Sequence, residues 1–243
     1  MGNARMIGAV VGIAVLSAAG GYGLGELTRP QTQLTDNASP MAVVTETVRA
    51  TPPPSSPTPT ATRTPVPNDK PGLIPGDISF DSETIEVVDD ADPGRTARIT
   101  VDVPHNWRLT DVGHRDWGKF NSSYSKRSFR IDSAFEPEKQ DAIMQRQFNR
   151  LRGLPPDQLV KLSDPVHGST IADDGDRRTH TTFTYTYLPP TDENLFYVID
   201  RWVSTSGDGL ADVEIVVSGL PQDKAGLELI MDRATKSVIR KDL

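Results

Sequence analysis

The sequence contains no cysteine among its 243 residues. Without thiols, the chain cannot form a disulfide scaffold, a thiolate zinc finger, a cysteine nucleophile or a cysteine-linked lipid anchor. Basic residues are also in the minority, with 26 Lys+Arg against 33 Asp+Glu and a formal net charge of −7. A general nucleic-acid binder needs a basic face that displaces counterions, so this balance argues against nucleic acid as a partner.

The sequence also lacks the motifs that mark common catalytic and cofactor sites. It has no G-x-S-x-G nucleophile elbow and no glycine-rich loop between a strand and a helix. Acidic residues gather at Asp173–Asp176 without the spacing of a calcium loop. No histidine lies at a metal-ligand interval from another; the four are His105, His114, His167 and His180. We therefore expect no catalytic residue, no metal site and no cofactor.

Residues 1–27 form the first of three compositional zones and predict a membrane anchor. The run Met6–Gly25 has no charged residue, and its 20 residues match the length that a helix needs to cross about 30 Å of hydrocarbon. Arg5 precedes the run, whereas Glu26 and Arg29 cancel after it, so the positive-inside bias keeps the N-terminus in the cytoplasm. The anchor would contact the lipid bilayer and place the C-terminal part outside the cytoplasm, at the cell membrane.

A cleavable signal peptide is the alternative interpretation of this zone. The small-residue triplet Ser17–Ala19 follows the apolar run Met6–Leu16 and offers a cleavage site, and cleavage would release a secreted protein. The apolar stretch continues past that triplet to Leu24, which favours an uncleaved single-pass anchor.

Residues 28–76 predict a disordered linker. These 49 residues hold 11 Pro and 10 Thr, so they lack the apolar side chains that offset the entropy of ordering, and their prolines favour an extended conformation. Residues 77–243 then predict one globular domain, because 167 residues are enough for a core and they hold 14 of the 15 aromatic residues. This domain carries a net charge of −8, which would push it away from an anionic lipid surface.

Alternation of apolar and polar residues predicts the strands of this domain. Two short strands are expected at 117–121 and 128–135, and the cleanest alternation is at Thr179–Leu188. Four longer runs also predict strands, and short turn-forming loops join the last three of them, which predicts an antiparallel meander. These runs are Arg98–Val103, Thr179–Leu188, Leu195–Ser204 and Ala211–Ser218.

Helical periodicity predicts two helices, Pro137–Arg152 and Pro221–Lys241. The first would bury Met144, Phe148 and Leu151 on one stripe. The second would bury Leu227, Ile230, Met231, Ala234 and Val238. Strands grouped in an antiparallel sheet and flanked by helices indicate an α+β fold, arranged as an α/β/α sandwich.

The motif Val103-Pro-His-Asn-Trp107 follows a strand at the start of this element order. The motif and the order together resemble the PsbP/Mog1-like domain, as in LpqN-type exported actinobacterial proteins, over about residues 80–241. The resemblance implies a membrane-tethered or exported module without enzymatic activity. LpqN-type proteins carry a lipobox cysteine, which this chain lacks, so its tether would have to be the apolar segment Met6–Leu24.

Five aromatic residues of the domain are candidates for lining a ligand groove, and the alternative for them is core packing. They are Trp107, Trp117, Tyr185, Tyr187 and Trp202. The leading hypothesis is a membrane-anchored, extracytoplasmic, non-catalytic module that binds a protein partner or a cell-envelope component. The alternative is a secreted or surface-tethered hydrolase with a dispersed Asp/His/Ser site.

Overall fold

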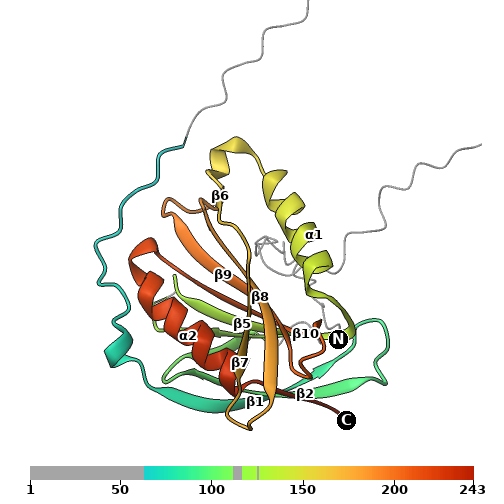
Figure 1. Cartoon of the computed structure of the whole chain (residues 1–243). Coiled ribbons are helices and arrows are strands. Elements are labelled where there is room, and N and C mark those ends of the chain that lie inside the picture. Colours follow the sequence, from blue (N-terminus) through green and yellow to red (C-terminus); the bar gives the residue numbers. More distant parts are fainter. Residues whose placement is uncertain (1–62, 112–116, 125) are drawn as a thin grey trace, which may run out of the picture. The chain divides into compact units, whose positions relative to one another are not determined.

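The computed structural model describes residues 63–111, 117–124 and 126–243. The predicted anchor at 1–27 and the predicted linker up to residue 62 lie outside the described residues. Within the described part of the chain, no helix is long and apolar enough to cross a membrane. Figure 1 shows the described elements, with two helices packed against a large antiparallel sheet and a smaller sheet beside it.

The large sheet has eight strands, and all of its neighbouring strands run antiparallel. Its order is β3-β4-β5-β10-β9-β8-β6, and β7 also pairs with β8. The predicted meander is confirmed as β8, β9 and β10, which are neighbours in the sheet. The strands are β3 (Arg108–Asp111), β4 (Trp117–Asn121), β5 (Ser128–Lys139), β6 (Lys161–Leu162), β7 (Val166–Ile171), β8 (Arg177–Tyr187), β9 (Phe196–Ser204) and β10 (Leu210–Gly219).

The smaller sheet has the order β1-β2-β11 and is also antiparallel. Its strands are β1 (Phe80–Val88), β2 (Thr96–Pro104) and β11 (Ile239–Asp242). The predicted strand at 98–103 is confirmed within β2. Strands β1 and β11 were not predicted, because β1 carries several exposed charged residues and β11 continues a helical pattern.

The two helices cover opposite faces of the large sheet. The Phe148 ring of α1 contacts the Phe183 ring of β8 at 5.7 Å between centroids, on the face to which Asp200 also points. The next residue of β9, Arg201, instead bonds Asp232 of α2 at 3.0 Å. Adjacent residues of a strand point to opposite faces, so the predicted α+β arrangement with a helix on each face is confirmed. The helices are α1 (Gln140–Arg152) and α2 (Lys224–Ser237), with single 3-10 turns at Pro75–Asp77, Pro156–Gln158 and Pro221–Asp223.

The predicted start of the first helix at Pro137 is wrong, since β5 continues to Lys139 and α1 begins at Gln140. The register between β5 and β10 shifts between Ala211 and Val213. The extra residues of β5 bulge out at this point, and Pro137 fits there because a bulged residue needs no ladder hydrogen bond.

The predicted end of the second helix at Lys241 is also wrong. Helix α2 ends at Ser237, and Val238 takes up extended backbone with φ −62° and ψ 126°. Ile239 then pairs with Thr100 of β2, so the last residues complete the smaller sheet. The predicted apolar stripe is confirmed within α2, where Leu227, Ile230, Met231 and Ala234 are buried in the main core. Val238 is also buried there, but it lies just beyond the end of the helix.

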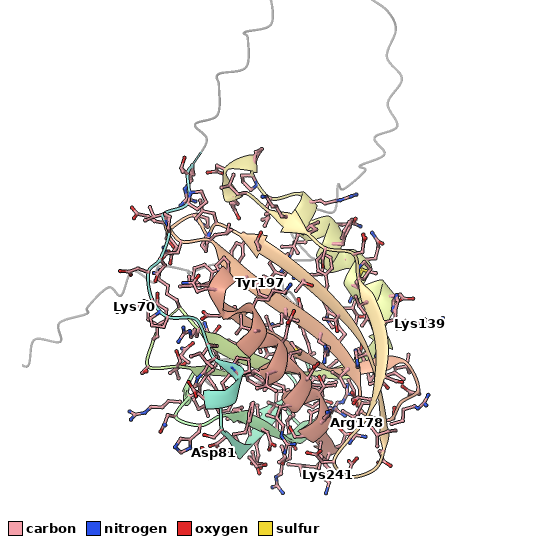
Figure 2. The ribbon with its side chains drawn as sticks, turned by 60° about the vertical axis from the view of Figure 1, so that its left-hand side comes forward. Lys70, Asp81, Lys139, Arg178, Tyr197 and Lys241 are labelled. Atoms are coloured by element: carbon pink, nitrogen blue, oxygen red, sulfur yellow. The ribbon has the colours of Figure 1, made fainter. Side chains whose placement is uncertain are left out.

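Residues 63–77, which we call the strap, lie along the domain, although composition predicts that residues 63–76 belong to the linker. Arg63 donates hydrogen bonds to the carbonyl oxygens of Pro189, at 2.8 Å, and Asp192. The Val66 amide donates to the carbonyl oxygen of Glu193 at 2.7 Å. Figure 2 shows the strap passing Lys70 on its way to Asp81 in β1. The average composition of the 49 residues carries no signal for these hydrogen bonds or for Leu73, which packs against the core.

The strap is held most closely at the start of α2. A Cβ on Gly72 would lie 2.4 Å from the carbonyl oxygen of Gln222, and a Cβ on Gly226 would lie 2.3 Å from Leu73 Cβ. The fully buried Asp223 carboxylate accepts a hydrogen bond from the Leu73 amide at 3.0 Å. Both glycines are therefore required by this close approach.

Candidate functional site beneath the first helix

Helix α1 is attached to the sheet largely by hydrogen bonds. Gln140 donates from Nε2 to the carbonyl oxygen of Thr179 at 2.9 Å, and its Oε1 accepts from Thr181 Oγ1 at 3.2 Å. Gln147 donates to Asp200 Oδ2 at 3.3 Å. The buried residues of α1 are Gln140, Ile143, Gln147 and Leu151. The attachment therefore differs from that of α2, whose buried face is mostly apolar.

The predicted apolar stripe of α1 is only partly correct. Leu151 is buried, but Met144 and Phe148 are of intermediate exposure, and Ile143 and Gln147 are buried in their place. The stripe is rotated by one residue because the sheet offers a buried acid, Asp200, as a partner for Gln147. Hydrophobic periodicity carries no signal for such a polar contact.

Beneath α1 the sheet brings together a set of residues that we call the polar cluster: Arg130, Asp132, Asp200, Trp202 and Glu214. Strand register places them on one face, since Asp132 lies opposite Glu214 and Glu214 lies opposite Trp202. Cross-strand partners share a face of the sheet, and Asp200 shares the face of Trp202 because it lies two residues earlier in β9.

Arg130 is the cation of the polar cluster and is nearly buried. Its Nε donates to Asp132 Oδ2 at 2.7 Å, its Nη2 lies 3.7 Å from Glu214 Oε2, and its guanidinium lies 5.7 Å from the centre of the Trp117 ring. Burial acts to lower the pKa of Arg130, but Asp132 and Glu214 oppose this, and the pKa is raised. The guanidinium is therefore a fixed positive charge that holds the carboxylates in place.

Asp200 is fully buried, and its pKa is raised in the folded state. Burial raises the pKa of Asp200 well above its usual value, and the charge of Glu214 and a hydrogen bond with that carboxyl group raise it further. Asp200 and Glu214 are therefore a pair of neighbouring carboxyl groups. Beside the pair, the indole Nε1 of the buried Trp202 forms no hydrogen bond within the described part of the chain.

Four of the five predicted groove aromatics lie on this α1 face. Trp117 lies opposite Asp132, and Tyr185 and Tyr187 continue the face along β8. Trp107 is not brought together with them, because it packs against the core beneath α2. Their contacts are those of core packing, with a row of rings from Phe183 to Phe196 at centroid spacings of 6.0, 5.9 and 6.1 Å. A ligand-binding role for the five residues stays a prediction.

Helix α1 does not cover the whole of this face, and over β3 and β4 the face is accessible to solvent. Register places Arg108 opposite Asn121 and Lys119 opposite Arg130, so these side chains share the face of Trp117. Arg108 is exposed, and Trp117, Lys119 and Asn121 are of intermediate exposure. We call Arg108, Trp117, Lys119 and Asn121 the shelf. It presents two cations and an aromatic ring beside the acids of the polar cluster.

The described histidines do not assemble a catalytic site. His105 Nδ1 lies 2.6 Å from Asp81 Oδ2 at the surface. His167 Nδ1 lies 3.0 Å from Thr181 Oγ1 and 3.6 Å from Asp141 Oδ1. A hydrolase triad needs the hydroxyl and the carboxylate on opposite ring nitrogens, and here both lie at Nδ1.

His114 lies outside the described residues, and His180 packs over Gly168, where a Cβ would lie 2.5 Å from its Cε1. Burial lowers the pKa of His180 to about 4, and the positive charge of Arg201 acts in the same direction. No group of three metal-ligating side chains is present in the described ranges. His180 is thus a neutral packing residue at neutral pH.

The acidic residues of the run Asp173–Asp176 form ion pairs. Asp174 lies 2.5 Å from Arg178, whose side chain is nearly buried, and Asp173 lies 3.1 Å from Arg233. A hydrogen bond from the backbone of Asp176 is the largest cause that lowers the pKa of Asp174. These carboxylates support the β7–β8 turn against the end of α2.

An open concavity lies between the strap and the β4–β5 turn. It is an open hollow of about 450 Å³ whose lining includes Leu73, Ile74, Tyr124 and Arg127. The Arg127 guanidinium is already bound by Asp223 at 2.8 Å and lies 5.2 Å from the centre of the Tyr124 ring. Its hydrogen-bonding capacity is therefore largely used in holding the strap.

No family model matches the chain, and no curated protein has a matching sequence. Several solved structures are similar to it, and two of them are as follows. One is the crystal structure of the Saccharomyces cerevisiae Ran-binding protein Mog1p, with 12% identity over 66% of this chain and 96% of that chain and a TM-score of 0.37. The other is a mutant of protein Mog1, with 12% identity over 65% of this chain and 95% of that chain and a TM-score of 0.36.

Both are Mog1. They belong to the family that the motif at Val103–Trp107 resembles. At this identity and TM-score the similarity carries no argument about partner or activity, and the α+β class rests on the sheets and helices described above. The likeness to LpqN-type exported proteins stays a prediction.

Proposed function

We propose that this chain is a membrane-anchored, extracytoplasmic, non-catalytic module that binds a protein partner or a cell-envelope component through the shelf. The proposal rests on one observation: the shelf presents the ring of Trp117 and the cations Arg108 and Lys119 to solvent. Behind them lie the nearly buried charges of the polar cluster. Aromatic and arginine side chains on a rigid sheet are typical of the energetic centres of protein interfaces.

The tether and the location rest on the sequence. The order is an uncharged 20-residue run, a Pro/Thr-rich segment and an acidic domain. A domain with net charge −8 would be repelled from an anionic lipid surface and would work away from it, at the end of its linker. No described contact favours the alternative of a hydrolase.

Topology is tested by protease shaving of intact cells that express the full chain. We expect residues 77–243 to be degraded from outside while a cytoplasmic control protein remains intact. Protection of these residues in intact cells, with degradation only after lysis, would refute the extracytoplasmic placement. Recovery of the domain in the culture medium, cut near Ser17–Ala19, would favour the secreted form instead.

The binding surface is tested by site-specific photocrosslinking in cell membranes. A photoreactive side chain at Asn121 on the shelf is compared with one at Glu86, an exposed residue of β1 in the smaller sheet. We expect a partner adduct from position 121 that Arg108→Glu reduces at least tenfold and that Lys241→Glu, a distant exposed control, leaves unchanged. Equal adducts from both positions, or no effect of Arg108→Glu, would show that the shelf is not the binding surface.

A further inference from the structure

Strand β7 lies at an edge of the large sheet and lacks the charges that the other terminal strands carry. Within the described residues its only strand partner is β8. None of its six residues is charged and none is proline. Folded proteins usually guard an edge with charges or prolines, so this edge is typical of a pairing site. The other terminal strands β1, β3, β6 and β11 carry Asp81, Glu83, Glu86, Arg108, Asp111, Lys161, Arg240, Lys241 and Asp242.

The β7 edge is also accessible to solvent. No residue of β7 is buried, and Val166 is 63% and Ile171 60% exposed. Alternate residues of an antiparallel strand bond the neighbouring strand, so half of the residues of β7 direct their N–H and C=O groups outward. Asp164 and Pro165 precede β7 and Asp173 closely follows it, which limits the unguarded edge to about six residues.

The two exposed hydrophobic residues of β7 lie on opposite faces of the sheet. His167 contacts Thr181 on the α1 face, and Ile171 shares that face because it lies four residues further along the strand. Gly168 lies against His180 on the α2 face, which Val166 shares. A ligand on one face could cover only one of the two hydrophobic residues. A strand added at the edge, with apolar side chains on both of its faces, covers both.

Gly168 leaves space at the middle of the edge, and the His180 ring reaches into it. The two residues lie opposite each other, and a Cβ at residue 168 would lie 2.5 Å from Cε1 of the ring. Burial lowers the pKa of His180 to about 4, so the ring is uncharged at neutral pH. Glycine in a strand often marks the close approach of another backbone, and an aromatic side chain across from it covers the gap. A partner residue beside Gly168 therefore meets a neutral aromatic ring.

A second copy of the chain does not fit this edge. Two copies joined edge to edge by a two-fold axis present the same face to the same side, and cross-strand partners share a face. Val166 can therefore never lie opposite Ile171 of the other copy, because these two residues lie on opposite faces. Two domains that each carry a net charge of −8 also repel one another. Both arguments favour a segment of a different protein.

We propose that the β7 edge binds an extended, uncharged segment of another protein, which adds to the large sheet as one more strand. Main-chain hydrogen bonds to β7 hold this segment, and its alternate side chains determine specificity. It places an apolar side chain beside Ile171 on the α1 face and a large apolar or aromatic one across from Gly168 on the α2 face. The inference goes beyond the proposed function and does not depend on it, because the shelf lies on β3 and β4 at the other end of the sheet.

Peptide selection against the full chain in detergent tests the β7 edge. Random peptides of about twelve residues are displayed on phage, and the enriched peptides should share an uncharged run of about six residues with apolar residues on both faces. Val166→Lys and Ile171→Lys give β7 the kind of charge that guards the other edges. Each should weaken binding of the synthetic enriched peptide at least tenfold.

Ile74→Lys is the matched control, because Ile74 of the strap is 60% exposed, as Ile171 is. This variant and Arg108→Glu on the shelf should leave peptide binding unchanged, which separates this proposal from the proposed function. Failure to enrich such peptides, or binding that neither lysine in β7 weakens, would overturn the proposal. A dimer in sedimentation equilibrium that Ile171→Lys dissociates would assign the edge to a second copy and also overturn it.

Main-chain pairing is tested with two N-methylated forms of the enriched peptide. Alternate amides of a strand point to opposite edges, so methylation of one alternate set blocks the hydrogen bonds to β7 and methylation of the other set does not. One form should lose at least tenfold in affinity and the other should bind as the parent peptide does. Equal losses, or no loss in either form, would show that the peptide does not bind as a strand.

Hydrogen–deuterium exchange then locates the bound peptide. The outward amides of residues 166–171, those not bonded to β8, should exchange rapidly in the free chain and at least tenfold more slowly with the peptide bound. The edge strand β1 serves as the internal control, and its exchange should not change. Outward amides of β7 that are already protected without peptide, or that the peptide leaves unprotected, would refute binding at this edge.

Discussion

Gln147 of α1 donates a hydrogen bond from Nε2 to Oδ2 of Asp200 in β9, at a distance of 3.3 Å. Asp200 is fully buried and Gln147 is 9% exposed. Burial raises the pKa of Asp200 well above its usual value, and the neighbouring carboxyl group of Glu214 raises it further. The first helix is therefore attached to the sheet through a buried acid whose pKa is raised.

Asp200→Asn should flatten the dependence of stability on pH. The pKa of Asp200 is raised in the folded state, above the ~3.9 of an unfolded aspartate, so between the two pKa values the folded chain binds more protons and stability falls as pH rises. Asparagine cannot ionise, and its side-chain oxygen can still accept the hydrogen bond from Gln147. Urea unfolding from pH 4 to 9 should show the variant gaining stability over the wild type as pH rises.

The matched control for this substitution is Asp90→Asn, which changes an exposed aspartate on the same chain. Its free energy of unfolding should differ from that of the wild type by an amount that stays constant across the same pH range. A constant difference for Asp200→Asn as well would mean that Asp200 is ionised in the folded state.

His180 should titrate at about pH 4 in the folded chain, as measured by histidine-selective NMR. Burial and the charge of Arg201 depress its pKa from an ordinary value of 6.5 to about 4. The neutral ring therefore contributes stability that is present above pH 6.5 and is lost as pH falls toward 4. Arg201→Gln should move the midpoint upward. A wild-type midpoint near 6.5 would contradict the buried position of the ring over Gly168.

Gly226→Ala should destabilise the domain by about 1–3 kcal/mol, because the new Cβ would lie 2.3 Å from Leu73 Cβ and force the strap away from α2. Gly72→Ala should act in the same direction through the carbonyl oxygen of Gln222. Gly76→Ala is the control, since a Cβ there meets nothing within 4 Å. Thermal and urea unfolding measure all three, and equal stabilities would show that the strap is not held at this point.

Asp223→Ala should cost about 3 kcal/mol or more. The buried carboxylate is the partner of the Arg127 guanidinium at 2.8 Å and of the backbone amides of Leu73 and Leu220, which would lose their acceptor. Asp77→Ala, at an exposed aspartate in the strap, should change the free energy of unfolding by less than about 0.5 kcal/mol. Comparable losses in the two variants would argue against Asp223 as the attachment point of the strap.

Secondary structure was most predictable where one face of an element packs on apolar core. The meander β8–β10 and the buried stripe of α2 follow directly from periodicity, because each buries a hydrophobic face. Periodicity predicted the wrong element where pairing with another strand determined the secondary structure. Ile239–Asp242 continues a helical pattern but pairs with β2, and Pro137 lies in a bulge of β5 rather than at a helix start.

The polar cluster could not be found from the sequence. Arg130, Asp132 and Glu214 alternate with apolar residues in their strands and have the pattern of a solvent-exposed face. Only the register of β5, β10 and β9 places them together, and only α1 buries Asp200 among them. A charged residue in a strand carries no local sign of whether water or a helix covers it.

By itself, the sequence determined the composition of the three zones, the exclusion of cysteine chemistry, the apolar faces and the α+β class, because these follow from local residue type and period. The tertiary structure decided which charges are buried, which linker residues join the domain and which strand is left at the edge. Those outcomes depend on contacts between residues far apart in the chain, such as Gln147 with Asp200 and Leu73 with Asp223.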